Sequence, residues 1–211
     1  VLARMLRYFA ARQIKNRATV GGNLCNASPI GDLAPVLMAL DAECVLASSH
    51  GQRRVPLSAF FLGYRQTAMK PGEILLAVEL DRPASGTLLG AYKVSRRREL
   101  DISAVCAGMA VRVQDGHVTH ARLAYGGMAA TTRRAEAAEA ELLGSAWSIE
   151  AIERARAALD FQPMSDHRGS AWYRSEVAGN LLIGFFEETR SQPFVALPRR
   201  PSGSALPGSE A

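Results

Sequence analysis

A glycine-rich segment near the start of the chain carries the residue types with the clearest potential for chemistry. The run Ala18–Asn23 (ATVGGN) places two adjacent glycines beside a hydroxyl residue and an amide. Such a backbone can approach a flat or phosphorylated ligand closely, with its N–H donors facing it. The spacing is not that of a Rossmann fingerprint, and no Walker-type Gly-Lys-Ser/Thr occurs. Because adjacent glycines also form simple turns, ligand binding and a bare turn both remain open at this point.

Small polar residues cluster on and after this segment. Five of them fall within fourteen positions that otherwise lack charge: Thr19, Asn23, Asn26, Ser28 and Asp32. Donors and acceptors placed between apolar residues are costly unless something satisfies them. The density of polar groups therefore favours a ligand.

Three further residues have one structural and one functional interpretation each. Asp32 can cap a helix over 33–40, or contact a ligand. Phe9 is either a core aromatic or a ring that stacks on a planar group. Lys93, in the strand-like run AYKV, either lies on a solvated face or places a cation against a phosphate or a reduced, anionic ring.

The charged run Arg96–Asp101 reads as an exposed loop, or as an anion-binding or subunit-docking loop in which Glu99 and Asp101 hold the arginines.

No catalytic or metal-binding constellation is predicted. The four histidines are isolated, and the three cysteines, Cys25, Cys44 and Cys106, lie too far apart for ligand spacing. Reduced thiols in a cytoplasmic protein are expected, and an iron–sulfur cluster held by this chain alone is excluded. If the chain belongs to an enzyme, a cofactor would supply the reactivity, and the protein would supply position and electrostatics.

Composition narrows the class of protein. The chain has 211 residues, of which 48% are hydrophobic and 21% charged, which suits one large or two small globular domains. Neither a membrane span nor a signal peptide is expected. The net charge of +5 comes from scattered arginines without interleaved aromatics, which argues against nucleic acid and for anionic cofactors or acidic partners. Because the first residue is not methionine, we expect a fragment or a processed piece of a longer chain.

Hydrophobic periodicity and turn signals predict an α+β organisation in two parts. The first part covers 1–82, the second covers 87–190 with a small antiparallel sheet under helices, and 193–211 is expected to be a disordered tail. Helices are predicted over 2–9, 33–40, 131–143, 148–159 and 171–190. Strands are predicted over 42–47, 53–57, 74–80, 90–94, 103–113 and 118–125, with hairpin turns at His50-Gly51 and Asp115-Gly116.

The sequence closely resembles the flavin domain of xanthine dehydrogenases, within the molybdenum hydroxylase flavoproteins. The resemblance spans about 7–190 and rests on collinear motifs: Phe9–Asn16, Ala18–Asn23, Ala27–Leu33, Phe60-Phe61, Tyr64-Arg65, Glu73–Leu76, Tyr92-Lys93, Arg97–Glu99, Asp101-Ile102, Gly108-Met109 and Tyr125–Ala129. It implies the C-terminal half of a vanillyl-alcohol-oxidase-type (PCMH) FAD domain. A C-terminal domain like that of CO dehydrogenase flavoproteins would follow.

The resemblance also implies roles for individual residues. Phe9 would stack on or beside the isoalloxazine, and Asp32 would contact the ring system or its polar edge. Lys93 would add a cation, and Leu75 would pack on the flavin or adenine region. The remaining implied contacts are Thr19, Val20, Gly21, Gly22 and Asn23 at the pyrophosphate and ribityl chain, and Cys25 and Asn26 along the flavin.

The implied activity is electron transfer from 2Fe–2S clusters, supplied ultimately by a molybdopterin centre on a large subunit, through FAD to NAD during purine hydroxylation. Such a chain would belong to a hetero-oligomer. The family's other flavin half and its iron–sulfur domains are absent from this sequence, so we expect these residues alone to bind FAD weakly and to be inactive. Leu100 also stands where the family often has an acidic residue beside the flavin and NAD.

Two alternatives remain open. One is another member of the same group, such as the flavoprotein of an aldehyde oxidase or a CO dehydrogenase. The other is an assembly module that holds no flavin.

Overall fold

The computed structural model describes residues 1–97 and 101–190, so the expected tail at 193–211 lies outside the described residues. The helices are α1 (Leu2–Tyr8), α2 (Arg12–Lys15), α3 (Val20–Cys25), α4 (Leu33–Ala39), α5 (Leu57–Phe60), α6 (Glu136–Leu142), α7 (Ile149–Ala157) and α8 (Ala171–Thr189). The strands are β1 (Glu43–Ser48), β2 (Gly51–Pro56), β3 (Phe61–Gly63), β4 (Gln66–Thr67), β5 (Ile74–Glu79), β6 (Leu88–Val94), β7 (Val105–Gln114), β8 (His117–Gly126) and β9 (Arg133–Arg134).

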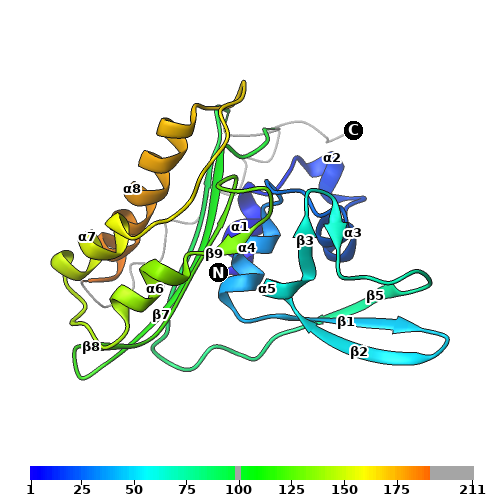
Figure 1. The fold of residues 1–211 in the computed structure, drawn as a ribbon, viewed down its shortest axis with the longest axis horizontal. Coiled ribbons are helices and arrows are strands. Elements are labelled where there is room, and N and C mark those ends of the chain that lie inside the picture. The colour runs from blue at the N-terminus through cyan, green and yellow to red at the C-terminus, as the bar shows by residue number, and fades with distance from the viewer. Residues whose placement is uncertain (98–100, 191–211) are drawn as a thin grey trace, which may run out of the picture.

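A four-stranded antiparallel sheet with the order β6-β7-β8-β9 separates two groups of helices. Helices α6, α7 and α8 cover one face of this sheet, and α1 and α4 cover the other (Figure 1). A second antiparallel sheet, with the order β2-β1-β5, lies beyond α4 and α5. The α+β class predicted from the sequence is therefore confirmed.

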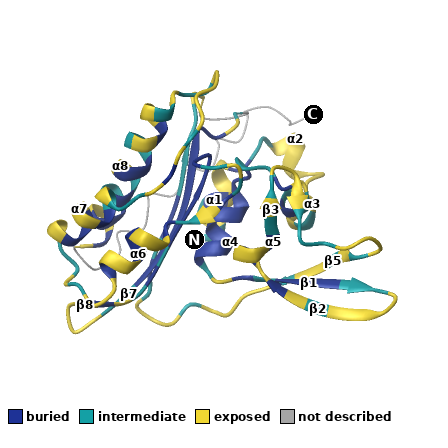
Figure 2. Ribbon diagram, in the orientation of Figure 1, coloured by how far each residue is buried: buried dark blue, intermediate teal, exposed yellow. Residues whose placement is uncertain are grey.

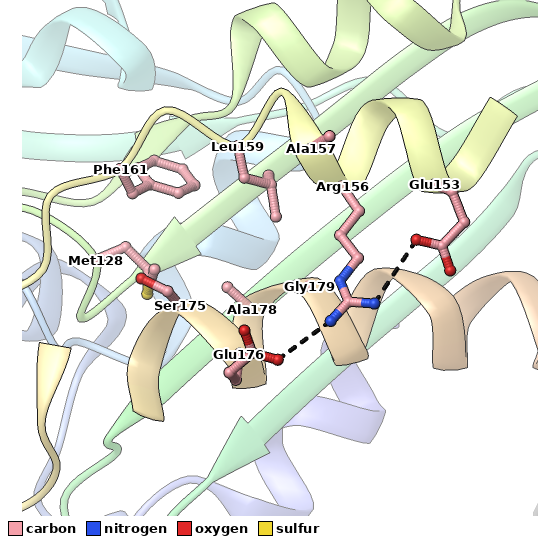
Figure 3. A pocket seen from close by; sticks show the side chains of 10 residues that line it. All are labelled: Met128, Glu153, Arg156, Ala157, Leu159, Phe161, Ser175, Glu176, Ala178 and Gly179. Carbon is pink, nitrogen blue, oxygen red and sulfur yellow. Dashed lines mark hydrogen bonds and ion pairs between the residues drawn. The ribbon is translucent and has the colours of Figure 1, made fainter. Parts of the chain in front are cut away.

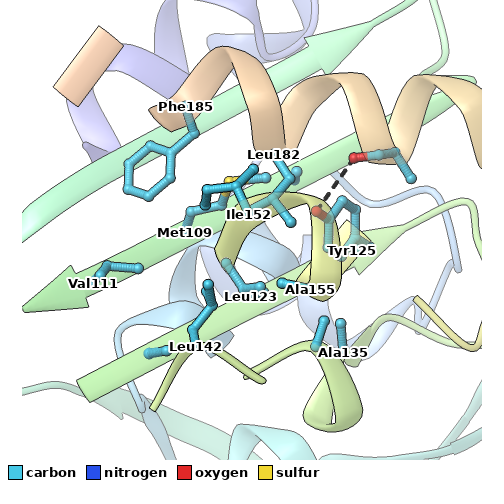
Figure 4. Close-up of a cluster of buried hydrophobic side chains, with 14 of the residues drawn as sticks. Met109, Val111, Leu123, Tyr125, Ala135, Leu142, Ile152, Ala155, Leu182 and Phe185 are labelled. Carbon is cyan, nitrogen blue, oxygen red and sulfur yellow. Dashed lines mark hydrogen bonds between the residues drawn. The ribbon is translucent and has the colours of Figure 1, made fainter. Parts of the chain in front are cut away.

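Successive side chains of a strand point to opposite sides of the sheet. Because helices cover both sides of this sheet, its central strands are buried on both faces. Met109 of β7 packs with Leu182 and Phe185 of α8 in one hydrophobic cluster (Figure 4). Cys106 and Ala110 of the same strand point to the opposite face and belong to a second cluster, which is built around α4. The same sheet thus supports the helical layer on one side and the start of α4 on the other.

Helix α4 lies unusually close to β7, and Gly108 permits this approach. A β-carbon added to Gly108 would lie 2.6 Å from the Cα atom of Val36 and would also collide with the carbonyl of Pro35. Both obstacles are backbone, so no side chain can move aside to make room. This contact fixes where α4, and the residue that precedes it, lies against the sheet.

We expect Gly108→Ala to lower the free energy of unfolding by about 1–3 kcal/mol, the usual cost of overpacking a well-packed core. Urea unfolding of the chain measures this change. Gly184→Ala is the matched control, because Gly184 is in α8 and an added β-carbon there meets nothing within 4 Å. That substitution should stabilise the helix by up to about 1 kcal/mol. Equal effects of the two substitutions would show that the close approach of α4 is unimportant.

The segment predicted to be a glycine-rich loop is instead the short helix α3. Thr19 is its N-cap, and its Oγ1 atom accepts a hydrogen bond from the Gly22 N–H at 2.9 Å. Glycine is a poor helix former, which is why the pattern Gly21-Gly22 indicated a loop. The cap and the packing of Leu24, which is buried, override that local preference.

Most other predicted elements are confirmed, with one clear shift. The helix expected over 131–143 begins only at Glu136, because Arg133–Arg134 pair with the end of β8 as strand β9. Ser148 caps α7 as predicted, accepting from the Ala151 N–H. The hairpin at Asp115-Gly116 is also present, with φ values of 50° and 78° that suit a two-residue turn.

The second sheet is much less buried than the first. Figure 2 shows β1 largely buried between β2 and β5, whereas β5 is mostly exposed. Strand β5 is an edge of this sheet and leaves Ile74 61% and Leu76 52% exposed. An apolar surface therefore flanks α3 on its β5 side.

Candidate functional site

A buried ion pair joins the start of α4 to strand β6. The Lys93 Nζ atom donates to Oδ2 of Asp32 at 2.7 Å, and the two side chains are only 6% and 8% exposed. The solvated-face interpretation of Lys93 is therefore wrong. Asp32 does occupy the N-cap position of α4, but its side chain makes no capping hydrogen bond, so the capping interpretation is wrong for the carboxylate.

The ion pair forms one wall of a hollow that we call the polar cavity. Its volume is about 250 Å³, and its lining includes Phe9, Asn23, Asn26, Asp32, Lys93 and Ser103. These residues come from the segment after α1, from α3 and the turn after it, from the start of α4, and from β6 and the segment before β7. The fold thus brings the ends of several elements together around one concave surface that carries these polar side chains.

Asn23 supplies an unsatisfied acceptor in this lining. Its Oδ1 atom is buried and has no hydrogen-bond partner among the described residues. A buried polar atom without a partner is costly, and a water, an ion or a ligand group can satisfy it. The polar cavity therefore offers an acceptor, the Asn23 oxygen, for a hydrogen-bond donor that the described residues do not supply.

A second hollow, which we call the apolar groove, lies on the other side of α3. It has a volume of about 370 Å³, and its lining includes Leu2, Leu6, Val20, Gly21, Leu37 and Leu75. A β-carbon on Gly21 would lie 3.9 Å from the Leu75 side chain, so the helix and β5 approach closely there. Because Asn23 lines the polar cavity and Val20 lines the groove, α3 borders both.

The predicted site residues thus fall into three groups. Phe9, Asn23, Asn26, Asp32 and Lys93 lie together on the polar cavity, whereas Val20, Gly21 and Leu75 lie on the apolar groove.

The third group lies in the lining of neither hollow. Thr19 and Gly22 form the cap of α3, and a β-carbon on Gly22 would lie 2.9 Å from the capping oxygen. The Cys25 thiol contacts Met69 Sδ at 3.7 Å, and burial raises the pKa of Cys25.

The loop before β7 closes part of the polar cavity. The Asp101 carboxylate accepts from the Arg97 N–H at 2.7 Å and from the Ile102 N–H at 3.0 Å. These contacts, the Arg97 bond foremost, lower the pKa of Asp101. The prediction that Asp101 holds an arginine of this loop is confirmed for Arg97, whereas residues 98–100, with Glu99 and Leu100, lie outside the described residues.

Sequence reasoning did not identify Ser103 as a site residue. Its side chain is fully buried, and its hydroxyl donates to Oδ1 of Asp32 at 2.5 Å. Ser103 was predicted only as the first residue of a strand. A small polar residue at the boundary of an apolar run, near a predicted cation, was the one available signal.

Sequence reasoning also did not identify Arg174, which holds the site from behind the sheet. This buried side chain on α8 donates through Nη1 to the carbonyls of Ala104 and, at 3.1 Å, Gly127, and through Nη2 to Asp166 at 2.7 Å. The Gly127 N–H in turn donates to the carbonyl of Pro29 at 2.7 Å. Arg174 therefore fixes both the residue after Ser103 and the segment that leads to Asp32.

Two ion-paired carboxylates have pKa values lowered to about 2. For Glu73 the main cause is the hydrogen bond from Arg53, at 2.7 Å. For Asp166, burial alone would raise the pKa, but hydrogen bonds from the Arg168 N–H and from Arg174 outweigh it. Both groups bind fewer protons in the folded than in the unfolded chain near pH 3, so they stabilise the fold above their unfolded pKa values.

We expect this contribution to be lost progressively as the pH falls from about 5 toward 2, because unfolded Asp and Glu titrate near pH 4. Urea unfolding at several pH values measures the slope of stability against pH. The double variant Glu73→Gln/Asp166→Asn should flatten that slope between pH 5 and 3. An unchanged slope would show that other groups govern acid unfolding.

A third hollow lies away from these residues, between α7 and α8, with a volume of about 310 Å³ (Figure 3). The Arg156 guanidinium extends along it and pairs with Glu153 at 3.6 Å and with Glu176 at 3.2 Å. Its charged groups are thus paired with one another.

No helix within 1–97 and 101–190 has the length and hydropathy needed to cross a bilayer. Over the same residues, no cluster of three or more His, Cys, Asp or Glu side chains could hold a metal ion.

Comparison with protein families divides the chain between two models. Residues 1–83 match the FAD binding domain in molybdopterin dehydrogenase, and residues 90–189 match the CO dehydrogenase flavoprotein C-terminal domain.

Individual relatives agree with these matches. The chain is 45% identical over 153 residues to a xanthine dehydrogenase/oxidase of Gallus gallus, covering 71% of this chain. It is 37% identical over 194 residues to a nicotinate hydroxylase of Emericella nidulans, covering 88% of this chain. It spans only 11% and 14% of the length of these two relatives.

Among solved structures, a carbon monoxide dehydrogenase from Hydrogenophaga pseudoflava superposes with a TM-score of 0.86 at 32% identity. The match covers 90% of this chain and 67% of the solved chain. A quinoline 2-oxidoreductase from Pseudomonas putida superposes with a TM-score of 0.80 at 27% identity, covering 89% of this chain and 66% of that one.

Proposed function

Because this chain belongs to the FAD-binding domains of the molybdopterin dehydrogenases, we propose that it is the flavin-binding part of a xanthine dehydrogenase. We further propose that 1–82 form the second part of the FAD-binding domain and that 87–190 form the C-terminal domain. The xanthine assignment is supported by the relatives of that name in animals, fungi and plants.

The observation that carries the proposal is the pairing of the polar cavity with the apolar groove across α3. FAD also combines polar and apolar parts. Its ring system has a polar edge, its pyrophosphate is charged, and its adenine has apolar faces. The unpartnered Oδ1 of Asn23 and the Asp32–Lys93 pair offer both acceptors and a cation on one side. The groove beside Val20 and Leu75 offers apolar contact on the other. The residues present therefore fit this cofactor.

We assign the contacts accordingly. Phe9 packs against the isoalloxazine, Asn23, Asn26 and Asp32 meet its polar edge, and Lys93 supplies the cation. Thr19 and Gly22 shape the turn of α3 that holds the pyrophosphate and ribityl chain, with Val20 and Gly21 along it. Leu75 packs on the flavin or adenine region, and Cys25 stands behind α3 against Met69.

When bound, FAD supplies the electron-accepting and electron-donating chemistry of the site. The chain contributes binding and electrostatics: no residue of the polar cavity is assigned as a general acid, general base or nucleophile. Phe9, with 9% exposure, excludes water from its side of the cavity. The Asp32–Lys93 pair places opposite charges 2.7 Å apart, so that the wall carries a strong local field without a net charge.

The wider reaction is part of the same proposal. Electrons would arrive from 2Fe–2S clusters and a molybdopterin centre on partner domains or subunits, and NAD would receive them. A hetero-oligomer in the cytoplasm is the assembly we propose, and the three free thiols of Cys25, Cys44 and Cys106 agree with a reducing compartment.

A CO-dehydrogenase-type or aldehyde-oxidase-type enzyme is the second candidate, and the superposition on the carbon monoxide dehydrogenase favours it. Assaying the full native complex with hypoxanthine, aldehydes and carbon monoxide separates these activities. Turnover of purines with reduction of NAD supports the proposal, and no turnover of purines would overturn the xanthine assignment. A full-length protein without any flavin would indicate an assembly module instead.

We expect Asn23→Leu to separate flavin binding from stability. Removing a buried amide oxygen that has no partner should leave the free energy of unfolding unchanged or slightly higher, because folding no longer removes an unpartnered oxygen from water. FAD affinity should fall about tenfold, because one hydrogen bond to the cofactor is lost. Flavin fluorescence titration of the full-length natural protein measures the affinity.

Asn16→Leu is the control, since Asn16 is an exposed amide outside both hollows. An Asn23→Leu protein with wild-type FAD affinity would remove Asn23 from the site.

A further inference from the structure

Ser103 occupies a position that the proposed contacts leave unexplained. It immediately precedes the pair Ala104-Val105 at the start of β7, and its side chain has no exposed surface. Its hydroxyl donates to Oδ1 of Asp32, while Lys93 donates to Oδ2 of the same carboxylate. Each carboxylate oxygen therefore has its own side-chain donor.

These two donors explain why the Asp32 side chain leaves its own helix. An aspartate at an N-cap position ordinarily accepts from the backbone of its own first turn. Here no such bond forms, and the carboxylate is turned toward β6 and the segment before β7 instead. Local helix chemistry therefore does not fix the orientation of Asp32, and the two donors do.

The backbone around Ser103 is held firmly enough to act as a support. The Ala104 N–H donates to the carbonyl of Val94 at 2.8 Å, and the Ala104 carbonyl accepts from Arg174. The Cys106 thiol also lies 3.5 Å from the main-chain carbonyl of Asp32. Ser103 thus presents its hydroxyl from a segment anchored to β6 on one side and to α8 on the other.

We propose that Ser103 is a positioning residue that fixes the Asp32 carboxylate and thereby sets the electric field that the Asp32–Lys93 pair presents to the bound flavin. This inference rests on the proposed FAD site and names a residue that controls its electrostatics. Ser103 acts through Asp32. Its hydroxyl offsets part of the carboxylate's negative field, and it keeps the second oxygen from turning away from Lys93.

Loss of this hydroxyl should make the flavin harder to reduce. A carboxylate with one donor fewer has a stronger negative field, and that field opposes the addition of electrons nearby. We expect Ser103→Ala to lower the equilibrium constant for two-electron flavin reduction about tenfold, which corresponds to about 30 mV for a two-electron couple. FAD content should change less than this, because Ser103 does not itself bind the cofactor.

The test is a spectroscopic redox titration of the flavin in the full-length natural protein. Four forms are compared, each with FAD added in excess so that the site is filled: wild type, Ser103→Ala, Asp32→Asn and the double variant. If Ser103 acts through Asp32, the potential falls in Ser103→Ala, and adding Ser103→Ala to Asp32→Asn has no further effect. Ser103→Thr, which keeps a hydroxyl, should restore most of the wild-type potential.

Thr189→Val is the control for the loss of a buried hydroxyl. Thr189 is buried near the end of α8, where its hydroxyl donates to the Phe185 carbonyl at 2.7 Å, and it lines neither hollow. This variant should show a similar change in Tm and no change in flavin potential. An unchanged potential in Ser103→Ala, or an equal fall in the Asp32→Asn background, would overturn the role of Ser103. A wild-type protein that binds no FAD would overturn the proposed function and this inference with it.

Discussion

The Asp32→Ala substitution should remove most of the bound FAD and lower the free energy of unfolding by about 3–5 kcal/mol. The expected loss of stability follows from the Lys93 ammonium, whose side chain is only 6% exposed and would lose its partner. A charge left buried and unpaired costs far more than the net worth of the pair itself. The loss of flavin follows from the removal of one polar wall of the cavity. Urea unfolding of the chain and FAD content of the full-length natural protein give the two readouts.

Two variants separate these effects. Asp32→Leu/Lys93→Met replaces both charges with apolar groups, so stability should return to within about 1–2 kcal/mol of wild type, while FAD content stays low. Glu79→Gln breaks the Arg54–Glu79 pair, whose side chains are 60% and 50% exposed, and should cost less than about 1 kcal/mol. An Asp32→Ala protein with wild-type flavin content would remove Asp32 from the site.

The Arg174→Met substitution should lower the free energy of unfolding by about 3 kcal/mol or more. The side chain of Arg174 is 3% exposed, and its removal leaves the carbonyls of Ala104 and Gly127 without this donor. Each buried acceptor that loses its partner costs about 1–3 kcal/mol. Ala104 directly follows Ser103 of the polar cavity, and Gly127 donates its N–H to Pro29 in the segment that leads to Asp32, so FAD affinity in the full-length protein should fall as well.

Arg156→Met is the matched control on the adjacent helix. Its guanidinium pairs with Glu153 and Glu176 (Figure 3), and its side chain is 31% exposed, so its loss should cost about 1 kcal/mol or less and leave FAD affinity unchanged. If both arginine variants lost the same stability, the contacts of Arg174 with the two carbonyls would contribute no more to the fold than the exposed pairs of Arg156.

Much of the fold follows from patterns that are local in the sequence. The hairpin at Asp115-Gly116 and the cap at Ser148 each depend on a few neighbouring residues, and both were predicted correctly. The hairpin expected at His50-Gly51 is also present, but its turn lies one residue earlier, at Ser49-His50, and Gly51 begins β2. The grouping of Phe9 and Asp32 with Lys93 was implied by family resemblance rather than by spacing, whereas Asn23 was expected at the pyrophosphate and ribityl chain. The structure places these four side chains on one cavity.

The errors concern interactions between distant parts of the chain. Gly21-Gly22 indicated a loop because local propensity says nothing of the cap by Thr19 or the burial of Leu24. Asp32 looked like a helix cap because the donors that capture it lie 61 and 71 residues away.

Arg174 could not be identified either. Its partners are two main-chain carbonyls and an aspartate, and because every residue has a main-chain carbonyl, residue types cannot show which ones accept a hydrogen bond.

The most direct test of the central claim is an experimental structure of the full-length natural protein purified with its flavin. The account predicts the isoalloxazine in contact with Phe9, Asn23, Asp32 and Lys93 on the polar cavity, with the rest of FAD passing α3 toward the apolar groove. A flavin bound elsewhere, or a polar cavity filled by protein side chains in the flavin-bound protein, would contradict it.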